Sequence, residues 1–218
     1  MNHSAKKIIR QYAQLVLGFS IIALGVSFSI RGELGTSPIS SVPYVLSLIL
    51  PISVGTGTII LHVALVLLQI IILRKDFKPI QLLQIVIGAS FGYITDFWLW
   101  VNRNTTYSSY FGQWVLCLLG IVLIAIGVYI EVDAKAIPLA AEGLAAAIVQ
   151  KKPTIKFGDV KIRIDVTLVA TATILSLVFL HKLKGVREGT FAAAILVGLI
   201  VKRIAAFVEK RRAKQSSA

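Results

Sequence analysis

Charged residues and cysteines are both scarce in this sequence of 218 residues. Only 15% of the residues are charged, 56% are hydrophobic, and the mean hydropathy is +0.83. An average soluble domain carries about 25% charged residues, so this composition excludes an ordinary soluble enzyme or binding domain. The single cysteine, Cys117, excludes a disulfide within the chain and a metal site built on paired cysteines.

Motifs for nucleotide, metal and hydrolase chemistry are also missing. The sequence has no P-loop, no His-Glu-x-x-His pair and no Gly-x-Ser-x-Gly elbow. Asp96, Glu142 and Asp165 lie in separate segments, without a spacing that demands a catalytic pair or a metal site. We therefore expect that the protein is not an enzyme and holds neither a cofactor nor a metal ion.

Long uncharged stretches are what the sequence does contain. Residues 11–30 and 104–130 have no Asp, Glu, Lys or Arg, and residues 35–73 are uncharged apart from His62. A helix of about 20 apolar residues crosses the hydrocarbon core of a membrane, and each span must be helical because lipid offers no hydrogen-bond partners. The sequence predicts an all-α polytopic membrane protein, with residues 1–218 forming a single integral membrane domain.

The net charge of +13 comes from basic clusters that flank the apolar stretches. This placement follows the positive-inside rule and suits anionic lipids of the bilayer rather than nucleic acid. It predicts cytoplasmic termini, with residues 209–218 as a basic tail. The first apolar run is as long as a span and lacks a small-x-small cleavage site after it, so we expect a retained helix rather than a secretory signal. The clusters are Lys6, Lys7 and Arg10; Arg74, Lys75 and Lys78; Lys151, Lys152 and Lys156; and Lys202, Arg203, Lys210, Arg211, Arg212 and Lys214.

The same order of landmark residues occurs twice along the chain. The matched positions are Gly25 with Gly127, Pro38 with Pro138, Gly55 with Gly158, and Gly92 with Gly198. We therefore predict two repeats, 11–102 and 113–208, of four helical segments each. The eight segments are expected at 11–31, 37–50, 56–73, 79–101, 113–130, 137–149, 161–180 and 190–208.

The second and sixth segments are short helices that begin at a proline, Pro38 or Pro138. At 1.5 Å per residue they reach only about 20 Å, too little to cross a membrane. If both are re-entrant, the chain crosses six times and the basic loop at 74–78 joins the termini inside. If all eight segments cross, that loop falls outside. The count of Lys and Arg favours six crossings and inverted repeats, although the loop at 182–187 then places three basic residues outside.

Ionisable residues of opposite sign occupy matched positions in the two repeats. Charges within spans are costly unless they are paired or hydrated, so these residues are candidates for gating or charge pairing, above all Asp96 with Lys202. The alternative is a structural or interfacial role, since Trp98 and Trp100 flank Asp96 and Lys202 begins the basic cluster of the tail. The matched pairs are Arg31 with Asp133, His62 with Asp165, and Asp96 with Lys202.

The first short helix carries the clearest polar pattern. Ser37 suits the N-cap and Pro38 the first helical position, so free backbone N–H groups would favour an anionic group there. The second short helix has a carboxylate, Glu142, instead of hydroxyls. We predict that Ser37, Ser40, Glu142 and His62 line one polar cavity; the alternative is helix packing by small residues. The complete set of predicted substrate-binding residues is Thr36, Ser37, Ser40, Ser41, Tyr44, His62 and Glu142.

The stretch LGTSPISSVPY at 34–44, with Gly25-Val26 before it and Gly55 after it, resembles the YczE/YitT-like family of bacterial integral membrane proteins. The similarity extends over nearly the whole chain, and Gly-Thr-Ser-Pro is its most specific part. The resemblance implies a multi-pass protein of the bacterial cytoplasmic membrane whose molecular activity is poorly defined. It assigns no site residues.

Duplicated membrane units with interrupted helices are typical of secondary transporters. We therefore expect a transporter or facilitator of a small, anionic or zwitterionic solute, bound between the two short helices near the midplane. The alternative is a non-transporting scaffold or accessory subunit that packs against a partner protein. Homo-oligomerisation is left open.

Overall fold

The computed structural model describes residues 3–216, with side chains over residues 6–213, and within that range the chain is helical without strands. The expected all-α architecture is confirmed. The α-helices are α1 (His3–Gly32), α2 (Pro38–Ile49), α3 (Val54–Leu73), α4 (Leu83–Val101), α5 (Tyr110–Ala134), α6 (Ala140–Lys151), α7 (Phe157–Leu180) and α8 (Glu188–Ser216). Short 3-10 helices, η1 (Arg74–Asp76), η2 (Pro79–Leu82) and η3 (Asn102–Asn104), lie in two of the connections.

Six of these helices are long and apolar enough to cross a membrane, as expected. The helices α2 and α6 have 12 residues each, which corresponds to about 18 Å and is too short to span. The candidate spans are Lys6–Gly32, Val54–Asp76, Pro79–Asn104, Tyr110–Ala134, Phe157–Leu180 and Glu188–Ala213.

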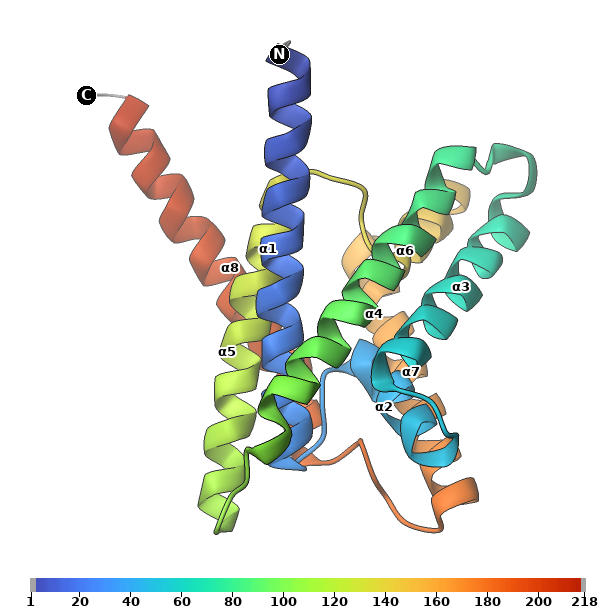
Figure 1. The fold of residues 1–218 in the computed structure, drawn as a ribbon. Coiled ribbons are helices and arrows are strands. Elements are labelled where there is room, and N and C mark those ends of the chain that lie inside the picture. The colour runs from blue at the N-terminus through green and yellow to red at the C-terminus, as the bar shows by residue number, and fades with distance from the viewer. Residues whose placement is uncertain (1–2, 217–218) are drawn as a thin grey trace.

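The path of the chain makes α2 and α6 re-entrant. Figure 1 shows the start of α1 and the end of α8 at the same end of the molecule, which we call the terminal end. The helix α1 ends at the opposite end of the molecule, which we call the far end. The connection after α1 runs back into the molecule, and α2 then returns to the far end. At the terminal end, the connection after α5 likewise runs into the molecule and α6 returns to the terminal end. Lys151, at the end of α6, bonds Asp76 in the α3–α4 connection at 2.6 Å. These two connections therefore share one end, as six crossings require.

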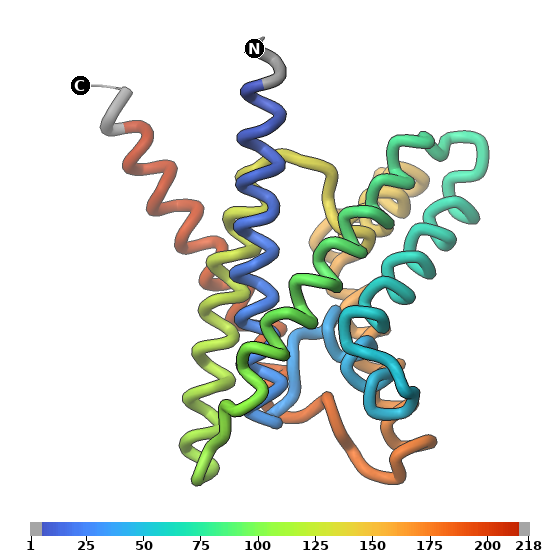
Figure 2. The backbone as a smooth tube through the Cα atoms, in the orientation of Figure 1, coloured from blue at the N-terminus to red at the C-terminus, as the bar shows by residue number. Residues whose placement is uncertain are grey.

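Antiparallel contact between α1 and α5 forms the centre of one half of the molecule (Figure 2). A Cβ added to Gly25 would lie 2.6 Å from the carbonyl oxygen of Gly120, and one added to Gly127 would lie 2.7 Å from that of Gly18. The missing side chains let the two backbones touch, as small residues do in membrane helix pairs.

Two apolar cores arise from the helix contacts. One core joins α2, α3, α6 and α7, with α2 against α7 and α6 against α3. The other joins α1, α4 and α5 through residues such as Phe19, Phe91 and Ile124. The start of α8 adds a small third cluster against α5, made of Leu34, Cys117, Ile121 and Ala193.

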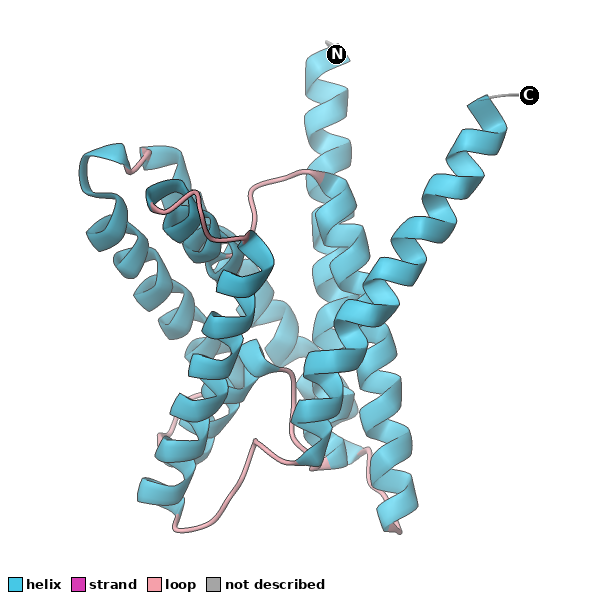
Figure 3. Cartoon of the chain, turned by 180° about the vertical axis from the view of Figure 1, so that it is seen from behind, coloured by secondary structure: helices cyan, strands magenta, loops and turns pink. Residues whose placement is uncertain are grey.

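The helix α8 diverges from α7, whereas α4 packs closely along α3. Figure 3 shows α7 and α8 separating towards the terminal end. Near the far end a cavity of about 470 Å³ lies where the two helices begin to separate, lined by Thr173, Val186 and Phe191 among others. Most of the outer face of α8 is consequently exposed.

Several expected helix boundaries differ from the observed ones, most of them by a few residues. The first and last helices are longer than expected, and residues 209–216 continue α8 instead of forming a separate tail; residues 217–218 lie outside the described range. The second short helix does not begin at Pro138. Leu139 occupies its N-cap position in an extended conformation, and the helix starts at Ala140.

Candidate functional site

An ionic cluster lies where α6 and α7 begin. The Lys161 ammonium of α7 is 2.7 Å from the carboxylate of Asp165, one helical turn later, and 3.7 Å from that of Glu142 in the first turn of α6. These side chains are only about a quarter to a third exposed, at 26%, 27% and 32%. Lys161 therefore joins two helices through two carboxylates.

A third carboxylate belongs to the same cluster. Glu131, near the end of α5, interacts electrostatically with both Glu142 and Lys161. The cluster thus contains three carboxyl groups and one ammonium group. We refer to Glu131, Glu142, Lys161 and Asp165 as the Lys161 cluster.

One oxygen in the Lys161 cluster has no partner within the described part of the chain. The Oε2 atom of Glu142 is buried and accepts no hydrogen bond, while Oε1 faces Lys161. A buried carboxylate oxygen without a donor is unfavourable by about 1–3 kcal/mol or more. The position is therefore suited to a hydrogen-bond donor such as an ammonium group or water.

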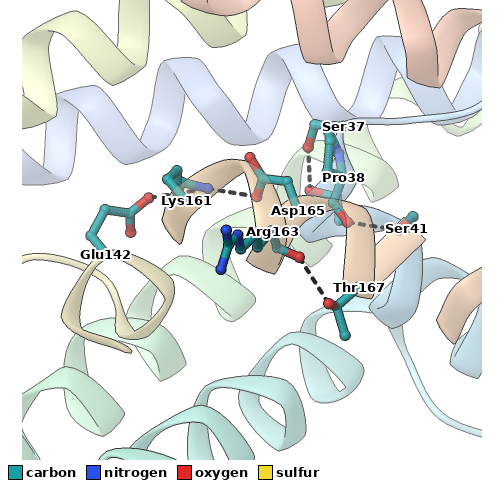
Figure 4. A network of polar contacts seen from close by, with 9 residues as sticks. Ser37, Pro38, Ser41, Glu142, Lys161, Arg163, Asp165 and Thr167 are labelled. Carbon is teal, nitrogen blue, oxygen red and sulfur yellow. Dashed lines mark hydrogen bonds and ion pairs between the residues drawn. The ribbon is translucent and has the colours of Figure 1, made fainter. Parts of the chain in front are cut away.

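The first turn of α2 lies along the same stretch of α7. Figure 4 shows Lys161 and Asp165 between Glu142 on one side and Ser37, Pro38 and Ser41 on the other. The helices α2 and α7 are in direct contact, and Val42 and Ile164 share the core beneath. The beginnings of both re-entrant helices thus flank the Lys161 cluster.

The α2 hydroxyls bond one another rather than capping the helix. Ser37 occupies the N-cap and Pro38 the first helical position as predicted, but Ser37 Oγ donates to Ser40 Oγ at 3.0 Å. Ser41 Oγ donates to the carbonyl of Pro38 at 2.6 Å. The expected side-chain cap is therefore absent at Ser37. The N–H groups of Ser40 and Ser41 bond the Ser37 carbonyl instead of facing a free site.

Tyr44 and Thr36 belong to a second polar region at the far end. Tyr44 lines a cavity of about 70 Å³, and the backbone of Thr36 bonds Gly185 beside it. The Thr36 hydroxyl is buried and has no hydrogen-bond partner among the residues that the structure describes. The residues lining the cavity are Ser29, Ile30, Glu33, Gly35, Tyr44, Leu183, Lys184, Gly185 and Arg187.

Glu33 at this cavity accepts a hydrogen bond of 2.7 Å from the hydroxyl of Tyr107 in the α4–α5 connection. The bond to the Glu33 carboxylate raises the pKa of Tyr107, because ionisation would remove the donated proton and set two negative charges together. Besides the Glu33 carboxylate, the far-end cavity is lined by two cationic side chains, Lys184 and Arg187.

His62 is not in the Lys161 cluster, contrary to the prediction of one cavity. Its Nδ1 atom lies 2.8 Å from the carbonyl of Thr58, and its ring packs against Gly88 between α3 and α4. Its Nε2 atom is buried without a partner within the described residues. Figure 4 shows Ser37 beside the same stretch of α7 as the Lys161 cluster, and Ser37 bonds Ser40, whereas His62 and Tyr44 lie elsewhere.

The predicted gate pair of Asp96 and Lys202 is not formed. Asp96 accepts hydrogen bonds from the Ser53 hydroxyl at 2.6 Å and the Gly55 N–H at 2.7 Å, where it caps the start of α3. Lys202 is exposed on α8. Asp96 lies in the last third of α4 and Lys202 at the midpoint of α8, and no ion pair joins them among the described residues.

The other matched charges are also separated. Arg31 ends α1 at the far end and bonds the Leu99 carbonyl, whereas Asp133 ends α5 at the terminal end and bonds Arg212 and Gln14. Asp165 bonds Lys161 instead of approaching His62. Matched positions in oppositely directed helices meet only near the midplane, so charges near the helix ends cannot pair in this way.

Sequence reasoning missed Glu131 and two buried glutamines. Gln69 of α3 donates to Gln84 of α4 at 2.8 Å and to the carbonyl of Ala140 at 3.1 Å, which holds the first turn of α6. A lone amide within the apolar run of α3 was the available signal for Gln69. For Glu131, the signal was a carboxylate just before the second short helix.

Comparisons with known proteins give a family but no activity. A model described as a family of unknown function, DUF6198, matches residues 9–206. The chain is similar to the uncharacterized protein YyaS of Bacillus subtilis, with 33% identity over 126 residues, which are 57% of this chain and 61% of YyaS. The match thus spans less than two thirds of that relative. No solved structure matches. These comparisons do not name the YczE/YitT-like family.

Proposed function

Because the family match spans almost the whole sequence, the chain belongs to DUF6198, and on that premise we propose that it is a membrane carrier or facilitator for a small zwitterionic solute. The solute binds at the Lys161 cluster, between the first turns of α2 and α6. The protein resides in the bacterial cytoplasmic membrane with both termini in the cytoplasm, and it is not an enzyme.

The observation that carries this proposal is the position of the Lys161 cluster. Ionisable side chains within a membrane are costly and are typically kept for transport or for charge transfer. Here three carboxylates and an ammonium gather at the beginning of α6, a helix too short to span, with the start of α2 beside them on α7. Such helix beginnings are the usual place for a transporter's substrate. Packing alone does not require them.

The charge of the cluster favours a zwitterion over a simple anion. An ammonium group of the solute fits the unpartnered Oε2 atom of Glu142, in a cluster where carboxyl groups outnumber the single ammonium. A carboxylate of the same solute finds Lys161 and the positive end of the α2 dipole close by.

The helix contacts are consistent with inverted repeats. Exchanging α1–α4 with α5–α8 turns the contact of α2 with α7 into that of α6 with α3, and the contact of Gly18 with Gly127 into that of Gly120 with Gly25. Such self-matching contacts are what a two-fold axis in the membrane plane produces. The axis then passes between α1 and α5.

Uptake into vesicles containing the purified protein tests the function. We expect uptake of small amino acids or similar zwitterions, and Glu142→Gln should weaken their binding about 10-fold or more, since a hydrogen bond to a charged group contributes about 1.5–3 kcal/mol. Asp76→Asn is the matched control, because it removes a carboxylate from an exposed ion pair outside the cluster. Uptake that survives Glu142→Gln unchanged for every transported solute would contradict the proposed site.

The alternative, a scaffold or accessory subunit, draws support from one feature. The outer faces of α7 and α8 are exposed, and Gly158 and Gly198 have open space around them. A partner helix would fit against such faces. In that case the protein takes up none of the solutes, and purification from the native membrane retains a second protein in fixed proportion.

A further inference from the structure

Two glycines join α3 to α4 at the far end. A Cβ added to Gly92 would lie 2.6 Å from the carbonyl oxygen of Gly55, so the two backbones are in contact. Asp96, one turn further along α4, accepts from the N–H of Gly55 and the hydroxyl of Ser53. The end of α4 is therefore docked on the start of α3 by a glycine pair and a carboxylate.

The glycines at the matched positions of the second half are bare. Gly158 near the start of α7 and Gly198 in α8 have no atom within 4 Å of an added Cβ. The two halves of the chain thus share this pair of glycines in sequence but differ in its contact. The first pair is closed and the second is open.

We propose that the bare glycine faces of α7 and α8 are docking surfaces for each other. In a second conformation α8 closes on the start of α7 at the terminal end, as α4 closes on α3 at the far end in the present structure. Alternation between two such arrangements is how inverted repeats expose one site to each side of a membrane. The inference rests on the repeat invoked in the proposed function, and it does not depend on the identity of a solute.

Charge at the matched positions supports the same contact. Lys202 corresponds to Asp96, and Asp159 corresponds to Thr56 in the first turn of the preceding helix. Asp96 accepts from the start of α3, which carries no acidic residue in its first turn. The first turn of α7 already has Asp159, so its complement is a cation. Docking of α8 brings Lys202 to Asp159 and explains the opposite signs.

The motion requires a pivot at the start of α8 and the loss of contacts further along it, since Leu196 and Val197 also pack against α5. The start of α8 is held by the Gly189 N–H on the Leu34 carbonyl at 2.8 Å and by Ala193 in its small core. Towards its other end, Arg212 bonds Asp133, but the Arg212 side chain is 62% exposed, and exposed pairs contribute little. Lys161 lies three residues after Gly158, so a docked α8 would close the terminal end over the Lys161 cluster.

Disulfide trapping tests the contact. In a Cys117→Ser background, Gly158→Cys with Gly198→Cys should form a disulfide within one chain under mild oxidation, since that bond needs Cα atoms within about 7 Å. Both sites have room for the new side chain. The matched control pairs Gly158→Cys with Phe191→Cys, at the anchored start of α8, and should not cross-link.

The outcomes separate the possible occupants. A cross-linked monomer in the first variant alone supports docking of α8 on α7. Cross-linked dimers would assign the bare faces to a second copy, and absence of any cross-link, or equal cross-linking in the control, would overturn the proposal.

Charge reversal gives a second readout. In the Gly158→Cys, Gly198→Cys protein, Lys202→Asp should slow cross-linking several-fold, and Asp159→Lys in addition should restore the rate. Additive slowing by the two changes would contradict the pair of Lys202 with Asp159. If cross-linking behaves as expected while no solute is taken up, the docking inference stands and the carrier function fails. If uptake occurs without cross-linking, the carrier function stands and the docking inference fails.

Discussion

Lys161 connects more of the candidate site than any other side chain described here. It bonds Asp165 on its own helix, faces Glu142 on α6, and interacts with Glu131 on α5. The three acids come from separate parts of the sequence, and only the fold brings them to one cation. A single residue therefore neutralises much of the negative charge that the helices gather at this position.

Removal of Lys161 should destabilise the protein. Lys161→Met keeps the length of the side chain but leaves the carboxylates uncompensated, and we expect a loss of about 1–3 kcal/mol in the free energy of unfolding. Thermal unfolding in detergent micelles should show this as a melting temperature several degrees lower. Adding Glu142→Gln and Asp165→Asn should recover most of the loss, because the two carboxylates that lie within 4 Å of the Lys161 ammonium are then neutral and need no cation. A Lys161→Met protein as stable as the parent would show that the cluster is hydrated rather than paired.

The positions of the α2 hydroxyls and of Glu142 at the beginnings of short helices were predictable from the sequence. The side chains that they contact were not. Ser37 and Pro38 occupy the positions that their types favour at a helix start. Glu131 was overlooked because a carboxylate at the end of an apolar run also suits a membrane interface. Its proximity to Glu142 depends on how the α5–α6 connection returns into the molecule, and local sequence does not specify that path.

At the scale of the helix, glycine determines which elements can touch. The contact of α1 with α5 and that of α3 with α4 both depend on glycines whose missing side chains admit a neighbouring backbone. The repeated glycines were visible in the sequence as landmarks. Their partners were not, because the spacing of Gly18 and Gly25 is the same whichever helix packs there.

Substitution of these glycines should separate packed from open positions. Gly120→Leu places a Cβ 2.6 Å from the carbonyl of Gly25, and because backbone atoms cannot yield easily, we expect a loss of at least about 3 kcal/mol or a failure to fold. Gly198→Leu meets open space and should change stability by no more than about 0.5 kcal/mol. Size-exclusion profiles and thermal unfolding of the two variants provide the comparison. Similar losses in both would contradict the difference in packing.

Across the whole molecule, the arrangement of spans agrees with the largest basic clusters, although the connection at 182–187 places three basic residues at the far end. The basic clusters near Lys7, Lys75, Lys152 and Arg211 all belong to segments at the terminal end. Composition and length sufficed to predict six long spans and two short helices. The tilt of α8 away from α7 was not predictable. Whether α8 packs on α7 or lies apart from it, the apolar faces of both helices remain in contact with lipid or protein.

Cysteine accessibility measures the topology directly. In a Cys117→Ser background, single cysteines at Asp76 and at Ser216 should both react with a membrane-impermeant maleimide only after the cytoplasmic side is exposed. Both positions belong to segments at the terminal end, and Asp76 bonds Lys151 of the re-entrant α6. A cysteine at Lys184, in the α7–α8 connection at the far end, should react from outside in intact cells. With eight crossings the α3–α4 connection would lie on the opposite side from the termini. External labelling at Asp76 would therefore exclude re-entrant α2 and α6, and with them the meeting of two helix starts on which the candidate site depends.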